Sequence, residues 1–453
     1  MLTATLVLQT VLAVESPAVA EASAPLAQDE PPWSEILQPV RAWPDAEDDA
    51  EEDAEEGPVF WHGDLHQALD LATRTNRPLF VSLRCLPCKQ CASFDADLLD
   101  GGPRLTPLLR RFVTVRLTDA AQLDLRLLPA AGYQDLDLSS WCYILSPEGS
   151  LYSVFGGKDH VSDETRISIE ALATNLERVL DHHHDARRGD WGIDRPAPAL
   201  GGPPRGPREL PRFDEWLAAD PWAQSQSCIH CHQVADILRW PEVEAGTFDK
   251  EHELDVWPLP ENIGLELDRD HGLRVTSVAP GSPAAAIGVE AGDVLGAAGG
   301  VRVFGQADLR GVLHRAGSEP TQLELVWLRG ESVLRGELSL AGSWRKTVLD
   351  WRMSISQGVV GAAPGFFPNR GPRTGRGSLS VRPFFGPRPR GPAHAAGLHG
   401  GHEIVAVGGE RPDLSGRAFL VWFRRRYEPG DEVVLTVRER SGEREIRYRP
   451  ARH

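Results

Sequence analysis

Residues 79–89 of the chain read Leu79-Phe80-Val81-Ser82-Leu83-Arg84-Cys85-Leu86-Pro87-Cys88-Lys89. The apolar first half is typical of a buried strand, and two cysteines follow it in a C-x-x-C spacing. If a helix begins directly after the motif, its N-terminus stabilises negative charge on the first sulfur at the loop tip. We therefore expect an accessible Cys85 thiolate near neutral pH, and a Cys85/Cys88 pair capable of reversible disulfide exchange.

The elements around this motif alternate between helix and strand. Asp64 and Gln67 form a capping box for a helix through Leu71, whose apolar residues keep helical spacing. Strands are expected at 79–83, 112–117, 141–145 and 151–155, and an amphipathic helix is expected at 163–182. This order resembles a thioredoxin-like α/β sandwich, which we place at residues 58–185.

A second cysteine motif, Cys228-Ile229-His230-Cys231-His232, has the C-x-x-C-H pattern of covalent haem c attachment. In that interpretation Cys228 and Cys231 add to the haem vinyl groups, and His232 supplies the proximal nitrogen. The alternatives are a zinc half-site or a simple thiol pair. The surrounding residues 213–260 follow a Pro/Gly linker at 186–212 and have little periodicity, so we expect a short c-haem-type segment there.

The remaining cysteines lie close to the first motif in the sequence or in the expected fold. Cys91 extends that motif to C-x-x-C-x-x-C, about one helical turn beyond Cys88, and is a candidate second resolving thiol. Cys142 lies in the strand expected to face the motif. Cys85, Cys88, Cys91 and Cys142 could therefore form a four-thiolate zinc or copper site, provided that all four sulfurs converge.

The composition limits the classes of function. A length of 453 residues suggests about three domains. The formal net charge is −17, and Asp45–Glu56 alone contributes nine carboxylates and no basic residue. A chain with this charge balance predicts no nucleic-acid partner.

The N-terminal residues resemble a secretory signal. Leu2–Val14 is a short apolar run, and two A-x-A patterns follow it. We therefore expect a leader at 1–24 and export to the periplasm or the cell envelope. Residues 25–57 are rich in Pro, Ala and acidic residues, which predicts a disordered linker. No other stretch reaches the roughly 18 apolar residues of a membrane span, so no transmembrane segment is expected after leader removal.

The C-terminal half contains an internal repeat at an offset of 109 residues. The stretch Pro283–Leu295 matches Pro392–Ile404, and the match continues without a gap through the Gly-Gly pairs at 299–300 and 408–409. Shared glycines at this many fixed positions predict two copies of one small β-rich unit. The expected copies span residues 261–341 and 350–450.

The first copy resembles a PDZ domain of the kind appended to bacterial periplasmic proteases. The resemblance runs through 262–267 (Asn-Ile-Gly-Leu-Glu-Leu), 278–283 (Val-Ala-Pro-Gly-Ser-Pro) and 288–295 (Gly-Val-Glu-Ala-Gly-Asp-Val-Leu). It implies a loop whose backbone N–H groups capture a peptide carboxylate, beside a strand that pairs with the peptide. The expected peptide-binding residues are Ile263, Gly264, Leu265, Leu309 and Leu313. The alternative is a PDZ-like fold used only for packing. The second copy is divergent, because it lacks the Gly-bearing loop.

The whole arrangement, over about residues 60–450, is similar to a bacterial family of thioredoxin-like/PDZ proteins, some of which carry selenocysteine in the redox motif. The similarity implies that Cys85 attacks a disulfide and that Cys88 resolves the resulting mixed disulfide. The chain departs from the thioredoxin pattern at residues 139–143, Ser-Ser-Trp-Cys-Tyr, where thioredoxins place a cis-proline that guides the substrate strand.

Two classes of function are compatible with these motifs. The first is an exported thiol-disulfide oxidoreductase that acts on protein disulfides or thiols, with covalent haem c relaying electrons and the PDZ unit binding peptide C-termini or strands. The second is a non-catalytic scaffold or metal-binding protein that uses the same domains for interaction. Both imply a multidomain fold, with a thioredoxin-like sandwich, a haem-type segment and two β-rich PDZ-like domains.

Overall fold

The computed structural model of the chain describes residues 31–39, 43, 58–86, 89–136, 138–158, 166–203, 205–219, 221–225, 227–249, 257–317, 320–346, 362–368, 379–382, 391–411, 414 and 416–451. The expected leader at 1–24 and the second cysteine of the first motif, Cys88, lie outside the described residues.

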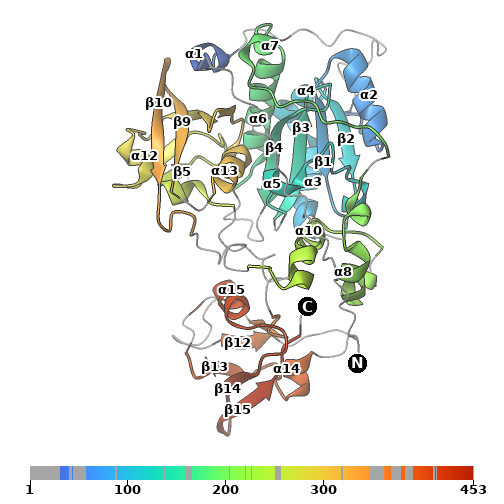
Figure 1. The fold of residues 1–453 in the computed structure, drawn as a ribbon, viewed down its shortest axis with the longest axis vertical. Helices are drawn as coiled ribbons and strands as arrows, with labels where there is room; N and C mark the ends of the chain where they lie inside the picture. Colours follow the sequence, from blue (N-terminus) through green and yellow to red (C-terminus); the bar gives the residue numbers. More distant parts are fainter. Residues whose placement is uncertain are drawn as a thin grey trace, which may run out of the picture.

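A four-stranded sheet forms the centre of the N-terminal unit (Figure 1). Its order is β2-β1-β3-β4, with β1 parallel to β2 and the other neighbouring pairs antiparallel. The strands are β1 (Leu79–Leu83), β2 (Val113–Leu117), β3 (Ser139–Leu145) and β4 (Leu151–Lys158). The expected strands are therefore present, with small shifts at their ends. A bridge between His62 and Val115 extends the parallel side of the sheet.

Both faces of this sheet are buried, because successive side chains of a strand point to opposite faces. On β1, Val81 and Leu83 belong to one hydrophobic cluster, whereas Phe80 belongs to another. The helices of the unit are α2 (Leu65–Thr75), α3 (Lys89–Asp100), α4 (Gly102–Leu109), η1 (Ala120–Gln122), α5 (Ala130–Tyr133) and α6 (Ile169–His183). The result is a layered α/β unit whose sheet ends carry the loops.

Side-chain caps determine where two of these helices begin. Asp64 Oδ1 accepts hydrogen bonds from the backbone N–H groups of His66 and Gln67, both at 2.9 Å, at the start of α2. Ser168 caps α6 in the same way through a backbone N–H of the first turn, at 3.0 Å. The helix expected from about residue 163 therefore begins only after Ser168.

The segment that carries the second cysteine motif is helical and packs on the sheet. Two short helical turns, α7 (Arg188–Trp191) and η3 (Pro207–Glu209), precede this segment. The segment itself contains α8 (Phe213–Ala219), α9 (Pro221–Gln224) and α10 (Cys231–Ala245). Trp216, Val234 and Ile237 belong to the same buried cluster as Val81 and Tyr143 of the sheet. The segment thus shares the core of the N-terminal unit. Most of these helices are short, and the buried face of the long helix α10 includes the polar residues Gln233 and Asp236, which is why apolar periodicity did not reveal them.

The next unit combines a four-stranded antiparallel sheet of order β10-β9-β7-β8 with the two-stranded sheet β5-β6. Its elements are η4 (Pro260–Ile263), β5 (Leu265–Leu267), β6 (Val275–Val278), α12 (Pro283–Ala286), β7 (Val294–Ala298), β8 (Val301–Arg302), α13 (Gln306–Arg315), β9 (Thr321–Arg329) and β10 (Ser332–Leu340). Leu265, Leu309 and Leu325 lie in its hydrophobic core.

Helix α13 is buried on two sides, between its own core and strand β4 of the N-terminal unit (Figure 1). Asp308 of α13 accepts hydrogen bonds from the backbone N–H of Val154 at 2.9 Å and from the hydroxyl of Ser153 at 2.7 Å. Arg310 donates to Asp135 at 2.8 Å, and neither side chain is more than 4% exposed. Because unpaired buried charges are costly, these contacts hold the two units in one relative orientation.

A short helix, α1 (Trp33–Ile36), lies within the stretch expected to be a disordered linker. Both Trp33 and Ile36 are buried in a cluster with Trp191 and with strand residues of the second unit. The prediction of disorder over the whole of residues 25–57 is therefore wrong for these four residues. The acidic composition of the stretch as a whole concealed two large apolar side chains that find a partner surface.

The C-terminal unit contains a five-stranded sheet of order β11-β12-β13-β14-β15. Its elements are β11 (Phe367–Pro368), β12 (Leu379–Arg382), α14 (Pro392–Ala395), β13 (Glu403–Val407), α15 (Gly416–Arg426), β14 (Val433–Glu439) and β15 (Gly442–Tyr448). Helix α14 and strand β13 begin 109 residues after α12 and β7. The repeat seen in the glycines is thus also a repeat of secondary-structure elements.

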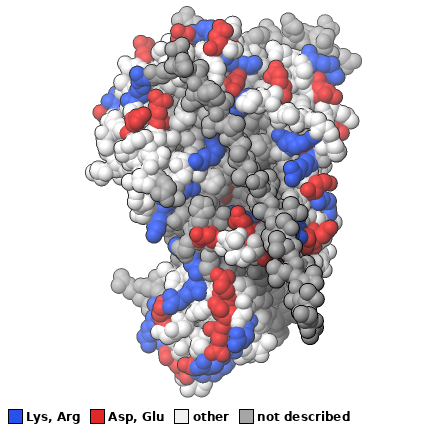
Figure 2. All heavy atoms as spheres, in the orientation of Figure 1, with Lys and Arg blue, Asp and Glu red and all other residues white. Residues whose placement is uncertain are grey.

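Basic and acidic side chains are interleaved on the face shown in Figure 2. On the C-terminal unit, for example, Arg438 pairs with Glu403 at 3.2 Å and Arg447 pairs with Glu445 at 2.7 Å. Exposed pairs of this kind add little stability. Within the part of the chain that the structure describes, no helix has the length and apolar character needed to cross a membrane.

The buried Asp308 carboxylate yields a prediction about stability. It accepts hydrogen bonds from Ser153, Val154, Phe304 and Gly305. We expect Asp308→Ala to lower the free energy of unfolding by several kcal/mol, because each buried donor left without an acceptor costs about 1–3 kcal/mol. Denaturant titration measures this loss, and amide exchange at Val154 and Gly305 localises it. Asp270→Ala, at an exposed position of the same unit, is the control; equal losses in both variants contradict the prediction.

Candidate thiol site

Cys85, the first cysteine of the motif, lies just past the carboxyl end of β1, as the sequence predicts. The chain leaving β1 continues along the loop that follows β2: Arg84 N–H donates to Leu117 O at 2.8 Å, and Leu86 N–H donates to Thr118 O at 3.2 Å. Helix α3 begins at Lys89. Cys85 is therefore held by backbone hydrogen bonds near the positive end of a helix dipole, which favours a thiolate.

Two arginines and one carboxylate surround the base of this loop. Asp95 of α3 pairs with Arg84 at 3.1 Å and with Arg116 at 2.8 Å. Arg84 Nη1 also donates to the carbonyl oxygen of Cys85 at 2.6 Å. The guanidinium thereby ties the backbone of the cysteine to α3 and fixes where its sulfur lies.

Cys85 Sγ lies 3.1 Å from His230 Nδ1, inside the second cysteine motif, although 145 residues separate the two in the sequence. Cys85 is only 2% exposed and His230 is 9% exposed. The expectation that the Cys85 sulfur is accessible to solvent is therefore wrong for this arrangement. The physical reason is that the loop carrying His230 covers the end of the sheet at which Cys85 lies.

Backbone hydrogen bonds hold this covering loop in place. Ile229 N–H donates to the carboxylate of Asp119 at 3.0 Å, and Ile229 O accepts from Ala120 N–H at 3.1 Å. His230 N–H donates to the side chain of Gln233 at 2.8 Å, at the start of α10. The loop is thus part of the hydrogen-bonded structure that follows β2.

Burial lowers the pKa of His230, which nearby Asp119 raises to a lesser extent. The imidazole is therefore neutral near neutral pH and has one ring nitrogen able to accept a proton. A neutral imidazole at hydrogen-bond distance from a thiol is the arrangement that activates a nucleophilic cysteine.

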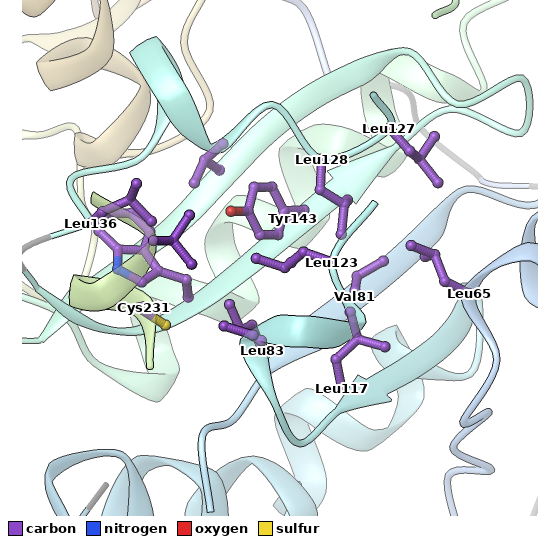
Figure 3. Packing of buried hydrophobic residues seen from close by; sticks show 14 of the residues in the cluster. Leu65, Val81, Leu83, Leu117, Leu123, Leu127, Leu128, Leu136, Tyr143 and Cys231 are labelled. Atoms are coloured by element: carbon purple, nitrogen blue, oxygen red, sulfur yellow. The ribbon is translucent and has the colours of Figure 1, made fainter. Parts of the chain in front are cut away.

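The second motif does not fit covalent haem in this arrangement. Cys231 is 8% exposed and packs in the main core cluster, where Figure 3 shows it beside Leu83 at one end of the cluster. Thioether bonds require both cysteine sulfurs to border the macrocycle, and here one sulfur lies among aliphatic side chains. His232 stacks on His230, with ring centroids 5.5 Å apart. Haem attachment through Cys228, Cys231 and His232 stays a prediction that needs a different arrangement of this loop.

Cys91 and Cys142 meet on the other side of the site. Both are buried, and both line one small cavity together with Ser82, Asp95 and Ser140. Burial raises the pKa of the Cys142 thiol to about 12, so this sulfur stays protonated at neutral pH. A buried, protonated thiol is a poor nucleophile and a poor metal ligand.

The proposed four-thiolate metal site lacks support from its described members. Among the described residues, no three His, Cys, Asp or Glu side chains are grouped closely enough to hold a metal ion. Cys85, Cys91 and Cys142 therefore do not converge on one point. The spacing of cysteines in the sequence could not show this, because convergence depends on which face of the sheet each sulfur occupies.

Two family models match parts of the chain. Residues 60–131 match one described as thioredoxin-like, and residues 274–329 match one described as a PDZ domain. The chain contains a thioredoxin-like domain and a PDZ domain. The thioredoxin-like match includes the Cys85 motif. The PDZ match includes α13, but it begins at residue 274 and therefore leaves out β5 and the loop before it. No curated protein matches the chain.

The stretch 139–143, Ser-Ser-Trp-Cys-Tyr, contains no proline, and its second residue is Ser140. This residue has a φ of 59°, a left-handed conformation that side chains other than glycine seldom adopt. It lies at the start of β3 and lines the same cavity as Cys142. The strand beside the thiol site therefore begins with a strained residue, which the sequence did not reveal.

The expected peptide-binding groove of the PDZ domain is filled. Ile263, Leu265, Leu309 and Leu313 are fully buried and pack together in the domain core. Gly264, in the loop before β5, has a left-handed φ of 88°, and a side chain there would collide with Ser282. The residues expected to bind a peptide are therefore adjacent, as predicted, but they do not line an open site.

A segment just after β10 closes this groove. Asn262 Nδ2 donates to the carbonyl oxygens of Trp344 at 2.8 Å and Lys346 at 2.9 Å. Arg345 donates to Leu313 O at 3.1 Å and to neighbouring carbonyls at the end of α13. Residues 344–346 thus link the loop before β5 to the end of α13. These are the elements between which the peptide was expected to bind.

Sequence reasoning missed His230, Asn262 and Trp344. His230 occupies a variable position of the C-x-x-C-H pattern, so the pattern drew attention to the residues on either side of it. Its one available signal was that an imidazole next to a cysteine suits thiol chemistry as well as haem ligation. Asn262 and Trp344 gave no signal, because their roles depend on a contact across 82 residues.

The burial of the thiols predicts an order of alkylation. In the reduced, native protein we expect Cys228 to react first, because it is the described cysteine that is not buried. Cys142 is expected to react last, because its raised pKa leaves almost no thiolate. Isotope-coded maleimide labelling followed by peptide mass spectrometry gives each rate. Labelling of Cys142 as fast as Cys228 contradicts the assignment.

The filled groove predicts that loosening residues 344–346 exposes a peptide site. We expect Asn262→Ala to raise the affinity for peptides with a free C-terminal carboxylate, because two hydrogen bonds worth about 0.5–1.5 kcal/mol each no longer hold the segment. Fluorescence anisotropy with a C-terminal peptide library measures the change, with Ser339→Ala on β10 as the control. Equal binding by wild type and both variants contradicts the prediction.

Proposed function

We propose that this chain is an exported thiol-disulfide oxidoreductase in which Cys85 exchanges disulfides with protein thiols. The observation that carries the proposal is the 3.1 Å contact between Cys85 Sγ and His230 Nδ1. A structural cysteine has no need of a neutral imidazole, whereas a nucleophilic cysteine uses one to accept its proton. The thioredoxin-like domain supports redox or thiol chemistry at this position.

The reaction that these residues support begins with proton transfer from the Cys85 thiol to His230. The thiolate, next to the N-terminus of α3, attacks one sulfur of a disulfide, and the other sulfur leaves as a thiolate. Cys88, by its position in the motif, then attacks Cys85 Sγ and releases the second sulfur. The disulfide is reduced to two thiols, and Cys85 and Cys88 become a disulfide. The same steps run in reverse for oxidation.

The surroundings of the site suit a protein substrate. Leu86, next to Cys85, is an apolar side chain that is 55% exposed, and it offers a contact for an apolar segment of a client. The PDZ domain implies peptide or protein binding, and we propose that it engages partners after its own segment 344–346 is released. Export to the periplasm or cell envelope would provide oxidised protein clients.

A second candidate is a non-catalytic adaptor, and it is favoured by the burial of Cys85 together with the filled PDZ groove. In that case the thioredoxin-like and PDZ domains catalyse no reaction. They hold the C-terminal unit and the molecular surface in place for binding to partner proteins. Metal or haem binding through the cysteines would then require a rearranged loop at residues 228–231.

Disulfide reduction separates the two candidates. With insulin as substrate and dithiothreitol as the electron source, we expect Cys85→Ser to abolish turnover. We expect His230→Phe to lower turnover on the order of 100-fold or more, because a general base contributes about 10²–10⁴ in rate. Cys142→Ser removes a thiol on the other face of the sheet and is expected to keep most of the activity. Equal turnover in all three variants and the wild type would establish the adaptor.

A further inference from the structure

One residue of the second cysteine motif contacts the first cysteine of the first motif. Helix α3 begins at Lys89, next to the first motif, and helix α10 begins at Cys231, the last cysteine of the second. His230, directly before Cys231, contacts Cys85 Sγ at 3.1 Å. Each motif therefore lies at the N-terminus of a helix of twelve residues or more, where backbone N–H groups favour thiolates.

Access from solvent differs between the two motifs. Cys85 is buried, and the loop that carries His230 covers it. Cys231 is buried as well, whereas Cys228 at the start of the loop is partly exposed. Thiol-disulfide exchange needs the attacking sulfur to reach the disulfide directly. An external protein disulfide can therefore meet Cys228, but it cannot meet Cys85 while the loop stays in place.

We infer that the loop from Cys228 to Cys231 is the resident exchange partner of Cys85, and that electrons pass between client proteins and the thioredoxin-like domain through it. This inference rests on the proposed oxidoreductase function, and it makes the disulfide between Cys228 and Cys231, rather than one in a client, the disulfide that Cys85 attacks. It assigns Cys228 as the sulfur that clients meet, and Cys231 as the sulfur that meets Cys85.

The exchange balances within the chain. When Cys228 and Cys231 are joined as a disulfide, the Cys85 thiolate bonds to Cys231 Sγ, the bond between Cys228 and Cys231 breaks, and Cys228 leaves as a thiolate. Cys88 then attacks Cys85 Sγ, and Cys231 leaves as a thiolate. Two electrons have moved from the first motif to the second. His230 accepts the proton of Cys85 and returns it to a departing thiolate.

The hydrogen bonds of the loop suit this role. Ile229 is tied at both its N–H and its carbonyl oxygen to residues 119–120, in the loop that follows β2. The stretch that follows Cys85 is tied to Thr118 in that same loop, through Leu86 N–H. Leu86 and Ile229 are therefore both fixed to one short piece of backbone, residues 118–120. Fixed relative positions of reacting groups raise the rate of an internal exchange over the reaction with a diffusing thiol.

Trapping of the mixed disulfide tests the inference. The full-length Cys88→Ser variant keeps Cys85 but lacks the thiol that resolves it. We expect mild oxidation with diamide, followed by alkylation and peptide mass spectrometry, to give a Cys85–Cys231 cross-link with Cys228 alkylated. The same treatment of Cys88→Ser/Cys231→Ala should give no such cross-link, and Cys88→Ser/Cys91→Ser, a matched removal of a nearby thiol, should still give it. A Cys85 that is only alkylated in Cys88→Ser overturns the inference.

Turnover distinguishes a failure of this route from a failure of the proposed function. We expect Cys228→Ser/Cys231→Ala to lose insulin reduction almost entirely, with a thermal unfolding curve that shows the protein still folded. If this variant keeps or gains activity while Cys85→Ser loses it, the oxidoreductase stands and the route is wrong. If Cys85→Ser also keeps activity, both are wrong. A covalent haem adduct, or one zinc ion per chain lost in Cys231→Ala, would likewise overturn the route.

Discussion

The contact between Cys85 and His230 depends on a loop that is anchored at both of its ends. On one side Ile229 is hydrogen-bonded to residues 119–120, and on the other Cys231 begins a helix that packs on the central sheet. If either anchor were absent, Cys85 would lie at an open sheet end, as in an ordinary dithiol enzyme. With both present, the thiol is buried beside a neutral imidazole. The burial of Cys85 and its contact with His230 both follow from this one packing arrangement, and the route that we propose for electrons depends on it.

The PDZ domain shows the same principle. Its groove is closed by residues 344–346, and its helix α13 is shared with the thioredoxin-like domain through Asp308 and Arg310. In both domains, a segment of the same chain covers the site at which we propose that a partner binds. Such internal contacts lower the apparent affinity for an external partner by the fraction of molecules in which the segment is released. Opening either site therefore costs free energy, because hydrogen bonds and buried apolar contacts of the covering segment are lost.

The strands, the first helices and the repeat could be predicted because each depends on local pattern. Short apolar runs indicated strands such as β1, Asp64 marked the start of α2, and spaced glycines revealed the repeat. The helices at 213–245 were missed, because α8 is short and the buried face of α10 includes polar residues such as Gln233 and Asp236. Trp33 and Ile36 were missed for the same reason. The functions suggested for Cys228 and Cys231 followed a pattern that several chemistries share, and packing decides among them.

The sequence by itself determined that a C-x-x-C pair follows a buried strand, that a second pair lies about 140 residues later, and that two related β-rich units end the chain. These features are local, and neighbouring residues suffice to specify them. Only the tertiary structure decided that the loop carrying the second pair covers Cys85, that His230 contacts Cys85, and that the residues expected to bind a peptide are buried. Each of these is a contact between residues distant in the sequence, formed because burying apolar side chains against the sheet brings their backbones together.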